Sequence, residues 1–435
     1  MRVFLLVPLL AYGCTTDQRR PLTDLEARED SATLWRSGRA WCETDSCPES
    51  ETDSARVYLA GMLALGWWSS QRIESNDDFL VAGRRLGPLM LAATLAATEV
   101  GGGSSLGVSE KAYGEWGLSA AWYVLAMAIT FVVLAWIAPH LRMTQVRTVP
   151  EGLTLRYGRA TGLLGAVLLI LPMVGLTAIQ LMASATVLSV MTGLGYAPSV
   201  VVVTVVVTVY SIMGGLWSVS ITDAVQWVFI VVGSILVIPY ALEFGGGWDA
   251  IRTHVPDERL SPTAGIGWKT IVGLTVMYIA SFSVGQESMQ RYFGARDAHA
   301  AKMGSIYAAL FYALYAFIPA FIGVLAFGLV QGGMLDPAAI TANGARYVLP
   351  TMATAVLPSA VVGLLFAGLI SATMSSADSN LLAAGAIFSN DIYRPIMRPQ
   401  ATDAQVLSIT RWTMAVVALL SLGIATTGAA APMTH

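Results

Sequence analysis

Long apolar segments alternate with short polar connections over most of the chain. A helix needs roughly 20 apolar residues to cross the hydrocarbon core of a bilayer, because it rises about 1.5 Å per residue. Apolar segments, some of them short or interrupted, lie at residues 55–69, 89–108, 118–138, 163–191, 198–212, 224–242, 271–284, 306–330, 361–388 and 406–426. The pattern predicts an all-α polytopic membrane protein in which about ten transmembrane helices form one bundle.

The apolar stretch at 367–393 is unusually rich in polar side chains, which are costly inside a membrane. These side chains are Ser371, Thr373, Ser375, Ser376 and Asp378. On a helix, Ser375, Ser376 and Ser379 share one face with Ala372, because they follow at i+3, i+4 and i+7. Hydroxyl and carbonyl oxygens suit a hard cation, and no Cys or His lies nearby to favour a soft metal. Alternatively, each hydroxyl bonds back to its own helix and the small residues allow close packing. The residues alone leave both interpretations open.

A second apolar segment, residues 89–108, is interrupted by Glu99 and by the run Gly101, Gly102 and Gly103. Glycine inside a helix is unfavourable and exposes the backbone. The triplet therefore predicts an unwound segment within this span.

Composition supports a membrane protein and excludes several other classes. Of 435 residues, 55% are hydrophobic and 12% are charged, whereas soluble domains are about 25% charged. The net charge of −3 offers no basic patch, so we expect no nucleic-acid partner. There is no phosphate-binding loop motif, and no His lies beside the serine clusters to activate a nucleophile. We therefore expect neither an enzyme nor a cofactor.

Residues 1–54 are predicted to be a leader. The first 14 residues resemble a bacterial lipoprotein signal ending at Cys14, and a wrongly placed start codon is the alternative. The remainder is polar and lacks apolar periodicity, which predicts a flexible segment. Cys14, Cys42 and Cys47 all precede the first full span, so no disulfide is expected in the membrane.

The cationic residues cluster in alternate connections between the spans. These are Arg72, Arg84, Arg85, Arg142, Arg147, Arg156, Arg159, Arg291, Arg296, Lys302, Arg394, Arg398 and Arg411. Cytoplasmic loops carry an excess of Lys and Arg, so these connections are predicted to be cytoplasmic and the N-terminus outside. The longer outer segments, residues 244–267 and 332–358, contain turn residues and are predicted to hold short helices over the bundle.

Four motifs in this order closely resemble the sodium/solute symporter family. They are DDFLVAGRR at 77–85, ATEVGGGSSLG at 97–107, GGLWSVSITDAVQ at 214–226, and SATMSSADSNLL leading to FSNDIY at 371–393. The resemblance covers residues 55–427 and predicts a transmembrane domain at 55–428. It implies the leucine-transporter type of fold, with two five-helix repeats of opposite topology whose first helices are broken at mid-membrane. Repeat one would span 89–242, and repeat two would begin near residue 271 and break at 278–285.

The resemblance also implies a sodium site. It assigns backbone carbonyls of Ala97, Val100 and Ala372 and the side chains of Ser375 and Ser376 as ligands. An unwound turn frees carbonyls, and neutral oxygens can replace part of a monovalent ion's hydration shell without holding it too tightly.

Further coupling and substrate candidates follow from the resemblance. Glu99 would tune cation affinity or accept a proton, with a cap on freed amides as the alternative. Asp378 would help to form a second cation site or serve packing. Ser104 occupies a substrate-binding position of a sugar-transporting relative, although its short side chain weakens the case for a hexose. Tyr278 and Phe282 would face the substrate.

Two further groups of polar residues receive a structural interpretation. Thr222 and Asp223 are predicted to cap a helix that begins at residue 224. Gln286, Gln290 and Arg291 are predicted to form a cytoplasmic helix end with a positive-inside anchor.

The implied function is sodium-coupled symport of a small organic solute by alternating access in a bacterial inner membrane. The partners would be the solute, the sodium ion and the lipid bilayer. A membrane sensor with the same fold and a non-functional truncated symporter are the alternatives, because the chain stops at His435 with fewer spans than family members usually have. The substrate is not specified by the sequence.

Overall fold

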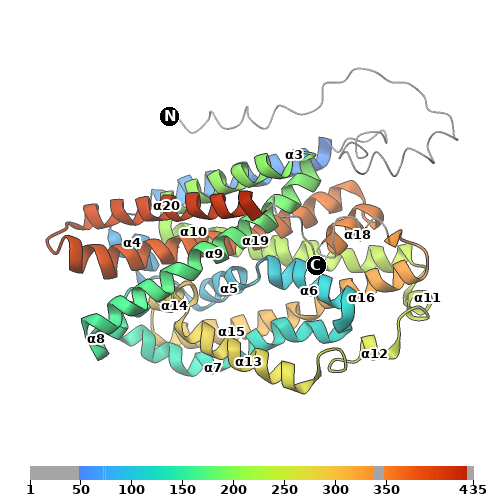
Figure 1. Ribbon diagram of the computed structural model, residues 1–435, viewed down its shortest axis with the longest axis horizontal. Coiled ribbons are helices and arrows are strands. Elements are labelled where there is room, and N and C mark those ends of the chain that lie inside the picture. Colours follow the sequence, from blue (N-terminus) through green and yellow to red (C-terminus); the bar gives the residue numbers. More distant parts are fainter. Residues whose placement is uncertain (1–48, 72, 74, 338–339, 341–346, 429–435) are drawn as a thin grey trace, which may run out of the picture.

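The structure, a computed structural model, describes residues 49–71, 73, 75–337, 340 and 347–428. All named elements in this part of the chain are helices (Figure 1). Those of the first half are α3 (Glu49–Ser70), α4 (Asn76–Val81), η3 (Ala82–Arg84), α5 (Pro88–Glu99), η4 (Gly103–Gly107), α6 (Val108–Lys111), η5 (Ala112–Trp116), η6 (Gly117–Ala121), α7 (Trp122–Met143), α8 (Val149–Tyr157), α9 (Arg159–Thr192) and α10 (Tyr196–Phe244).

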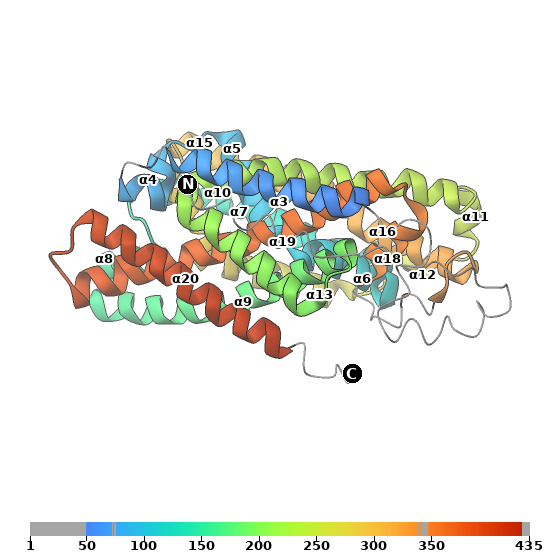
Figure 2. The same cartoon turned by 90° about the horizontal axis from the view of Figure 1, so that it is seen from above.

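The helices of the second half complete an elongated bundle (Figures 1 and 2). They are α11 (Trp248–Arg252), α12 (Asp257–Leu260), α13 (Gly267–Val284), α14 (Gln286–Phe293), α15 (Ala298–Tyr315), α16 (Phe317–Gln331), α18 (Val348–Val356), α19 (Ser359–Ile387), η8 (Phe388–Met397) and α20 (Asp403–Gly428).

In the described chain, 7 helical runs are long and apolar enough to cross a membrane. The sequence pattern predicted about ten spans, because it counted shorter and broken segments separately. Two of the predicted spans, 198–212 and 224–242, form the single helix α10, which bends at Gly215. Another, the segment at 89–108, is divided into α5 and η4. The predicted all-α bundle is confirmed, and its segmentation differs where helices bend or break.

The first helix begins earlier than the predicted domain boundary. Helix α3 starts at Glu49, six residues before the predicted boundary at residue 55. The sequence of residues 49–54, ESETDS, is rich in acidic and hydroxyl residues, which favour the N-terminal end of a helix. The rest of the leader, with its three cysteines, lies outside the described residues.

Helix α19 forms the centre of the bundle. It packs against α10 and α9, and also contacts α3, α5 and α20. In the most apolar 18-residue window of its span, 89% of residues are buried, against 28% in the corresponding windows of α9 and α20. The polar stretch identified in the sequence therefore lies where lipid does not reach it.

The two ends of the bundle differ. Helices α4 and α8, which lie in Arg-rich connections, are at one end, whereas the short helices α11 and α18 lie at the other (Figures 1 and 2). The short helices predicted within 244–267 and 332–358 are thus present in the described part of those segments. This arrangement agrees with the alternation of Arg-rich and Arg-poor connections.

Candidate ion and solute site

The first core helix is broken where the glycine triplet predicts. Helix α5 ends at Glu99, Val100 leaves helical geometry with φ −81° and ψ 68°, and the π-helical turn η4 follows. A Cβ atom on Gly101 would lie 2.6 Å from the hydroxyl of Ser376 and 2.7 Å from the amide nitrogen of Gln180. The glycine therefore allows the break to approach α19 and α9 closely.

The second predicted break lies at the end of its predicted range. Helix α13 ends at Val284, Gly285 is extended with φ −62° and ψ 117°, and α14 begins at Gln286. Tyr278 and Phe282 therefore lie on the last turns of α13, before the break.

Serine hydroxyls of α19 meet the carbonyls that end α5. The Ser375 hydroxyl donates to the Ala97 carbonyl at 2.7 Å, and the Ser376 hydroxyl donates to the Thr98 carbonyl at 2.5 Å. The same hydroxyls lie 3.0 and 3.2 Å from the Ala372 carbonyl. These neutral oxygens, from both helices, converge in the protein interior.

The predicted ligand set is brought together except at one position. In the described chain, no side-chain hydroxyl donates to the carbonyl of Val100, and the carbonyl of Thr98 faces Ser376 instead. Thr98 was missed because the choice of carbonyl depends on where the helix ends, which only the backbone dihedrals reveal. Each hydroxyl also lies within reach of the Ala372 carbonyl of its own helix, so the structure shows the back-bonding that was the alternative interpretation. The ion-ligand interpretation stays a prediction.

The oxygen set suits a hard monovalent cation. Its members are neutral hydroxyls and carbonyls, the kinds of oxygen that can replace part of an ion's hydration shell. Among the described residues there is no group of three or more His, Cys, Asp or Glu that could hold a metal ion.

Glu99 connects the two helix breaks. The hydroxyl of Ser288, on α14, donates to its carboxylate. The Ser104 hydroxyl donates to the Glu99 carbonyl at 3.0 Å, and only 2% of Ser104 is exposed. Neither contact is the amide cap that was considered for the carboxylate. The Ser104 hydroxyl is therefore already hydrogen-bonded to the backbone of the break.

A buried ion pair lies beside the serines. The guanidinium of Arg291 is 3.1 Å from the Asp223 carboxylate and 2.5 Å from the Ser379 hydroxyl. Its Nε donates to Thr94 at 2.9 Å, and Thr94 donates to Asp223 at 2.5 Å. Asp223 and Arg291 are 0% and 1% exposed. The pair joins α5, α10, α14 and α19.

This ion pair corrects two expectations. Asp223 and Thr222 are not helix caps, because α10 continues through them, and the Thr222 hydroxyl donates to carbonyls of Ser218 and Val219 on its own helix. Arg291 is no interfacial anchor. Asp223 alone carried a signal in the sequence, as an acidic residue next to a long apolar segment. Arg291 lies in the polar sequence QESMQRYF and carried none.

Gln286 and Gln290 are likewise buried and hydrogen-bonded to neighbouring helices, and they do not form an exposed helix end. The side-chain carbonyl of Gln286 accepts from the Val149 amide at 2.7 Å, and the Gln290 amide donates to the Leu80 carbonyl at 2.6 Å. Both residues are at most 1% exposed. The first hydrogen bond connects α14 to α8, and the second connects it to α4.

Asp378 lies next to this network. The hydroxyl of Tyr210 donates to its carboxylate at 2.6 Å, and Ser379 donates at 3.1 Å. Ser379 also lies 3.3 Å from the Thr98 hydroxyl. Through Ser379, Asp378 is connected to both the ion pair and the serine and carbonyl cluster.

The aromatic candidates form one cluster near the breaks. The rings of Tyr278 and Phe282 lie 5.4 Å apart, Tyr278 meets Tyr123 at 5.8 Å, and Phe282 meets Phe131 at 5.7 Å. Tyr278 and Phe282 are 6% and 5% exposed. They pack against α7 in this structure.

Gln180 is a further polar residue at the first break that the sequence reading missed. Its side-chain carbonyl accepts from the Gly102 amide at 3.1 Å, which satisfies a donor freed by the unwinding. The available signal was a lone amide side chain within the apolar segment 163–191.

Known proteins resemble the chain over most of its length. The sodium/mannose cotransporter SLC5A10 of Bos taurus is 28% identical over 412 residues, covering 85% of this chain and 67% of its own. The sodium/glucose cotransporter of Vibrio parahaemolyticus is 27% identical over 398 residues, covering 84% of this chain and 72% of its own. The sodium/sialic acid symporter SiaT of Proteus mirabilis is 25% identical over 379 residues, covering 84% and 75%.

The fold has a solved counterpart. A structure of a Na⁺-coupled sialic acid symporter, in a substrate-bound outward-open state, matches with a TM-score of 0.79 at 21% identity, covering 88% of this chain and 82% of that chain. The expected leucine-transporter type of fold is confirmed. The model of the sodium:solute symporter family matches residues 79–433. The chain therefore belongs to the sodium:solute symporter family, and is a transporter and not an enzyme.

Proposed function

We propose that this protein imports a small polar organic solute with sodium across a bacterial inner membrane, with its N-terminus outside. The direction of insertion is supported by the Arg-rich connections around α4 and α8, which lie together at one end of the bundle (Figure 1). Relatives named for mannose, glucose and sialic acid support a polar organic solute.

The sodium ion would bind where α5 ends against α19. The observation that carries this assignment is the convergence of the Ser375 and Ser376 hydroxyls on the carbonyls of Ala97, Thr98 and Ala372. In this position the ion would join the two repeats. Their relative movement would then depend on whether the ion is bound, which is the requirement for coupled transport.

The solute would bind beside the same breaks. Tyr278 and Phe282 precede the second break, and Glu99 joins the first break to α14 through Ser288. The Glu99 carboxylate would tune the affinity for the cation, since it lies two residues after Ala97. Asp378 would contribute to a second cation position through Ser379.

The sodium assignment can be tested without knowing the solute. A ligand that binds only the folded protein raises its melting temperature in proportion to RT ln(1 + [L]/Kd). Melting of the purified full chain should rise with sodium chloride more than with potassium chloride. Ser375→Ala and Ser376→Ala should each move this sodium response to higher concentrations.

Ser211→Ala provides a matched control. Ser211 is also buried in the bundle, and its hydroxyl donates to the Val207 carbonyl of its own helix at 2.6 Å. It should retain the wild-type sodium response. An unchanged response in both Ser375→Ala and Ser376→Ala would refute the ligand assignment.

A further inference from the structure

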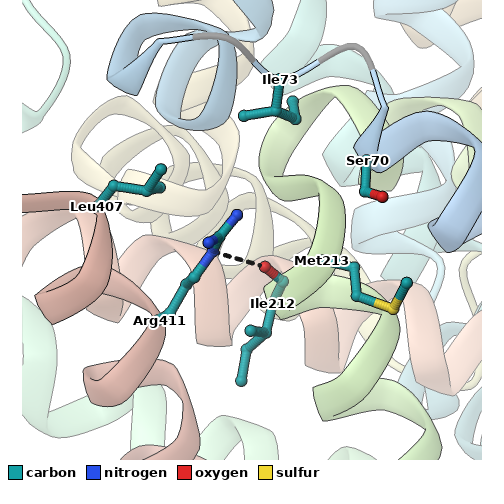
Figure 3. A pocket seen from close by; sticks show the side chains of 6 residues that line it. All are labelled: Ser70, Ile73, Ile212, Met213, Leu407 and Arg411. Carbon is teal, nitrogen blue, oxygen red and sulfur yellow. Dashed lines mark hydrogen bonds between the residues drawn. The ribbon is translucent and has the colours of Figure 1, made fainter. Parts of the chain in front are cut away.

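A pocket outside the transport site lies between α3, α10 and α20. It encloses about 470 Å³ and is lined by Ser70, Ile73, Ile212, Met213, Leu407 and Arg411 (Figure 3). All six residues are partly exposed, so the pocket opens to the surface. Its volume falls in the range of about 300–1,000 Å³ that is usual for ligand sites.

Arg411 is the charged residue among these six, and in the described chain only one of its nitrogens makes a hydrogen bond. Its Nε donates to the Ile212 carbonyl at 3.1 Å. Helix α10 bends three residues later at Gly215, where φ is 52°, and helix carbonyls just before a break need other partners. This contact explains why an arginine is tolerated within α20.

The terminal nitrogens of Arg411 remain available. Among the described residues they have no hydrogen-bond or ion-pair partner, although the guanidinium carbon lies 5.3 Å from the Phe79 ring centroid. Figure 3 shows the terminal nitrogens pointing away from Ile212, toward the side of the pocket that Ile73 and Ser70 line. A guanidinium has five N–H donors, so most of them are free to bind an anion.

The surroundings of the pocket are those of a lipid interface. Along α20, Trp412, Val416 and Leu419 are 68%, 50% and 65% exposed, which is typical of a surface that faces acyl chains. Helix α20, which carries Leu407 and Arg411, contacts α4. Helix α4 lies at the end of the bundle that holds the Arg-rich connections (Figure 1). Apolar walls and one free guanidinium thus meet at the end of the bundle that is predicted to face the cytoplasm, where phospholipid headgroups would lie.

We propose that this pocket binds the phosphate of an anionic phospholipid. The free nitrogens of Arg411 would hold the phosphate in the two-point geometry that guanidinium favours. Ile73, Met213 and Leu407 would cover the glycerol and the first methylene groups. A free phosphate ion would gain nothing from these apolar walls, and basic pockets between transmembrane helices are known to suit lipid headgroups. This inference does not rest on the sodium assignment.

The test uses the purified, delipidated full chain in detergent, with lipid binding followed by native mass spectrometry and by melting temperature. Phosphatidylglycerol should bind and raise the melting temperature more than phosphatidylcholine or sodium phosphate. Arg411→Gln keeps a donor for the Ile212 carbonyl but removes the charge, and should weaken phosphatidylglycerol binding by about tenfold or more. Arg398→Gln, a change at an exposed arginine, should bind as the wild type does.

Leu407→Trp supplies an independent variant, because it fills the pocket without altering Arg411. It should also weaken phosphatidylglycerol binding, and it decides the matter if Arg411→Gln does not fold. Equal binding of phosphatidylcholine, equal stabilisation by inorganic phosphate, or an equal loss in Arg398→Gln would overturn the proposal. Undiminished phosphatidylglycerol binding in Leu407→Trp would do the same.

Discussion

Removal of one partner of the buried ion pair should strongly destabilise the protein. Arg291 and Asp223 are almost fully buried with an N–O distance of 3.1 Å. At that distance two unit charges attract by about 5 kcal/mol at an effective dielectric constant of about 20. Arg291→Gln retains a donor for Ser379 but leaves the Asp223 carboxylate without a counter-charge. We expect a loss of about 3–5 kcal/mol in the free energy of unfolding.

A double-mutant cycle separates the ion pair from general damage. Asp223→Asn alone leaves Arg291 unpaired and should cost a similar amount, whereas the double variant restores neutrality and allows an amide pair. The double variant should therefore lose less than the sum of the single variants, by about 0.5–3 kcal/mol. The assay is equilibrium unfolding of purified protein in detergent. The control, Arg398→Gln at an exposed position, should change stability by no more than about 0.5 kcal/mol.

Two results would refute this reasoning. If Arg291→Gln changes the free energy of unfolding by less than about 1 kcal/mol, the charge of Asp223 is compensated elsewhere. If the two single effects add without a coupling term, the residues do not act as a pair.

Three further outcomes are expected. Glu99→Gln keeps an acceptor for Ser288 but removes a negative charge near the proposed cation, so half-saturation for sodium in the melting assay should rise; identical sodium and pH profiles would leave only a structural role. A cysteine replacing Arg85, in a background without the native cysteines, should resist an impermeant maleimide in intact cells, and ready labelling from outside would reverse the topology. Gly215→Ala should lower the free energy of unfolding by about 1–3 kcal/mol, because φ there is 52° and its Cβ would lie 2.4 Å from a carbonyl oxygen. Gly61→Ala, with open space around it, is the control. Equal stability of the two variants would contradict this explanation.

The sequence determined the class of fold and the location of the first helix break. Apolar segments of bilayer length have few alternatives to helices, since each backbone polar group must be satisfied within the membrane. The glycine triplet marked the break beside Val100 because glycine both weakens a helix and admits close neighbours. The polar face of α19 was likewise readable, because helical periodicity places Ser375 and Ser376 on one side.

The tertiary structure alone decided which atoms meet at the site. The distance between Thr98 and Ser376 in sequence is large, and their contact depends on the dihedral angles at which α5 ends and on the packing of α19. The Asp223 and Arg291 pair is another such case. Each residue had a plausible local role, as a helix cap or an interfacial anchor, and local rules could not reveal that α10 and α14 bring the two charges together. The two charges pair because an isolated charge in the protein interior would cost too much free energy.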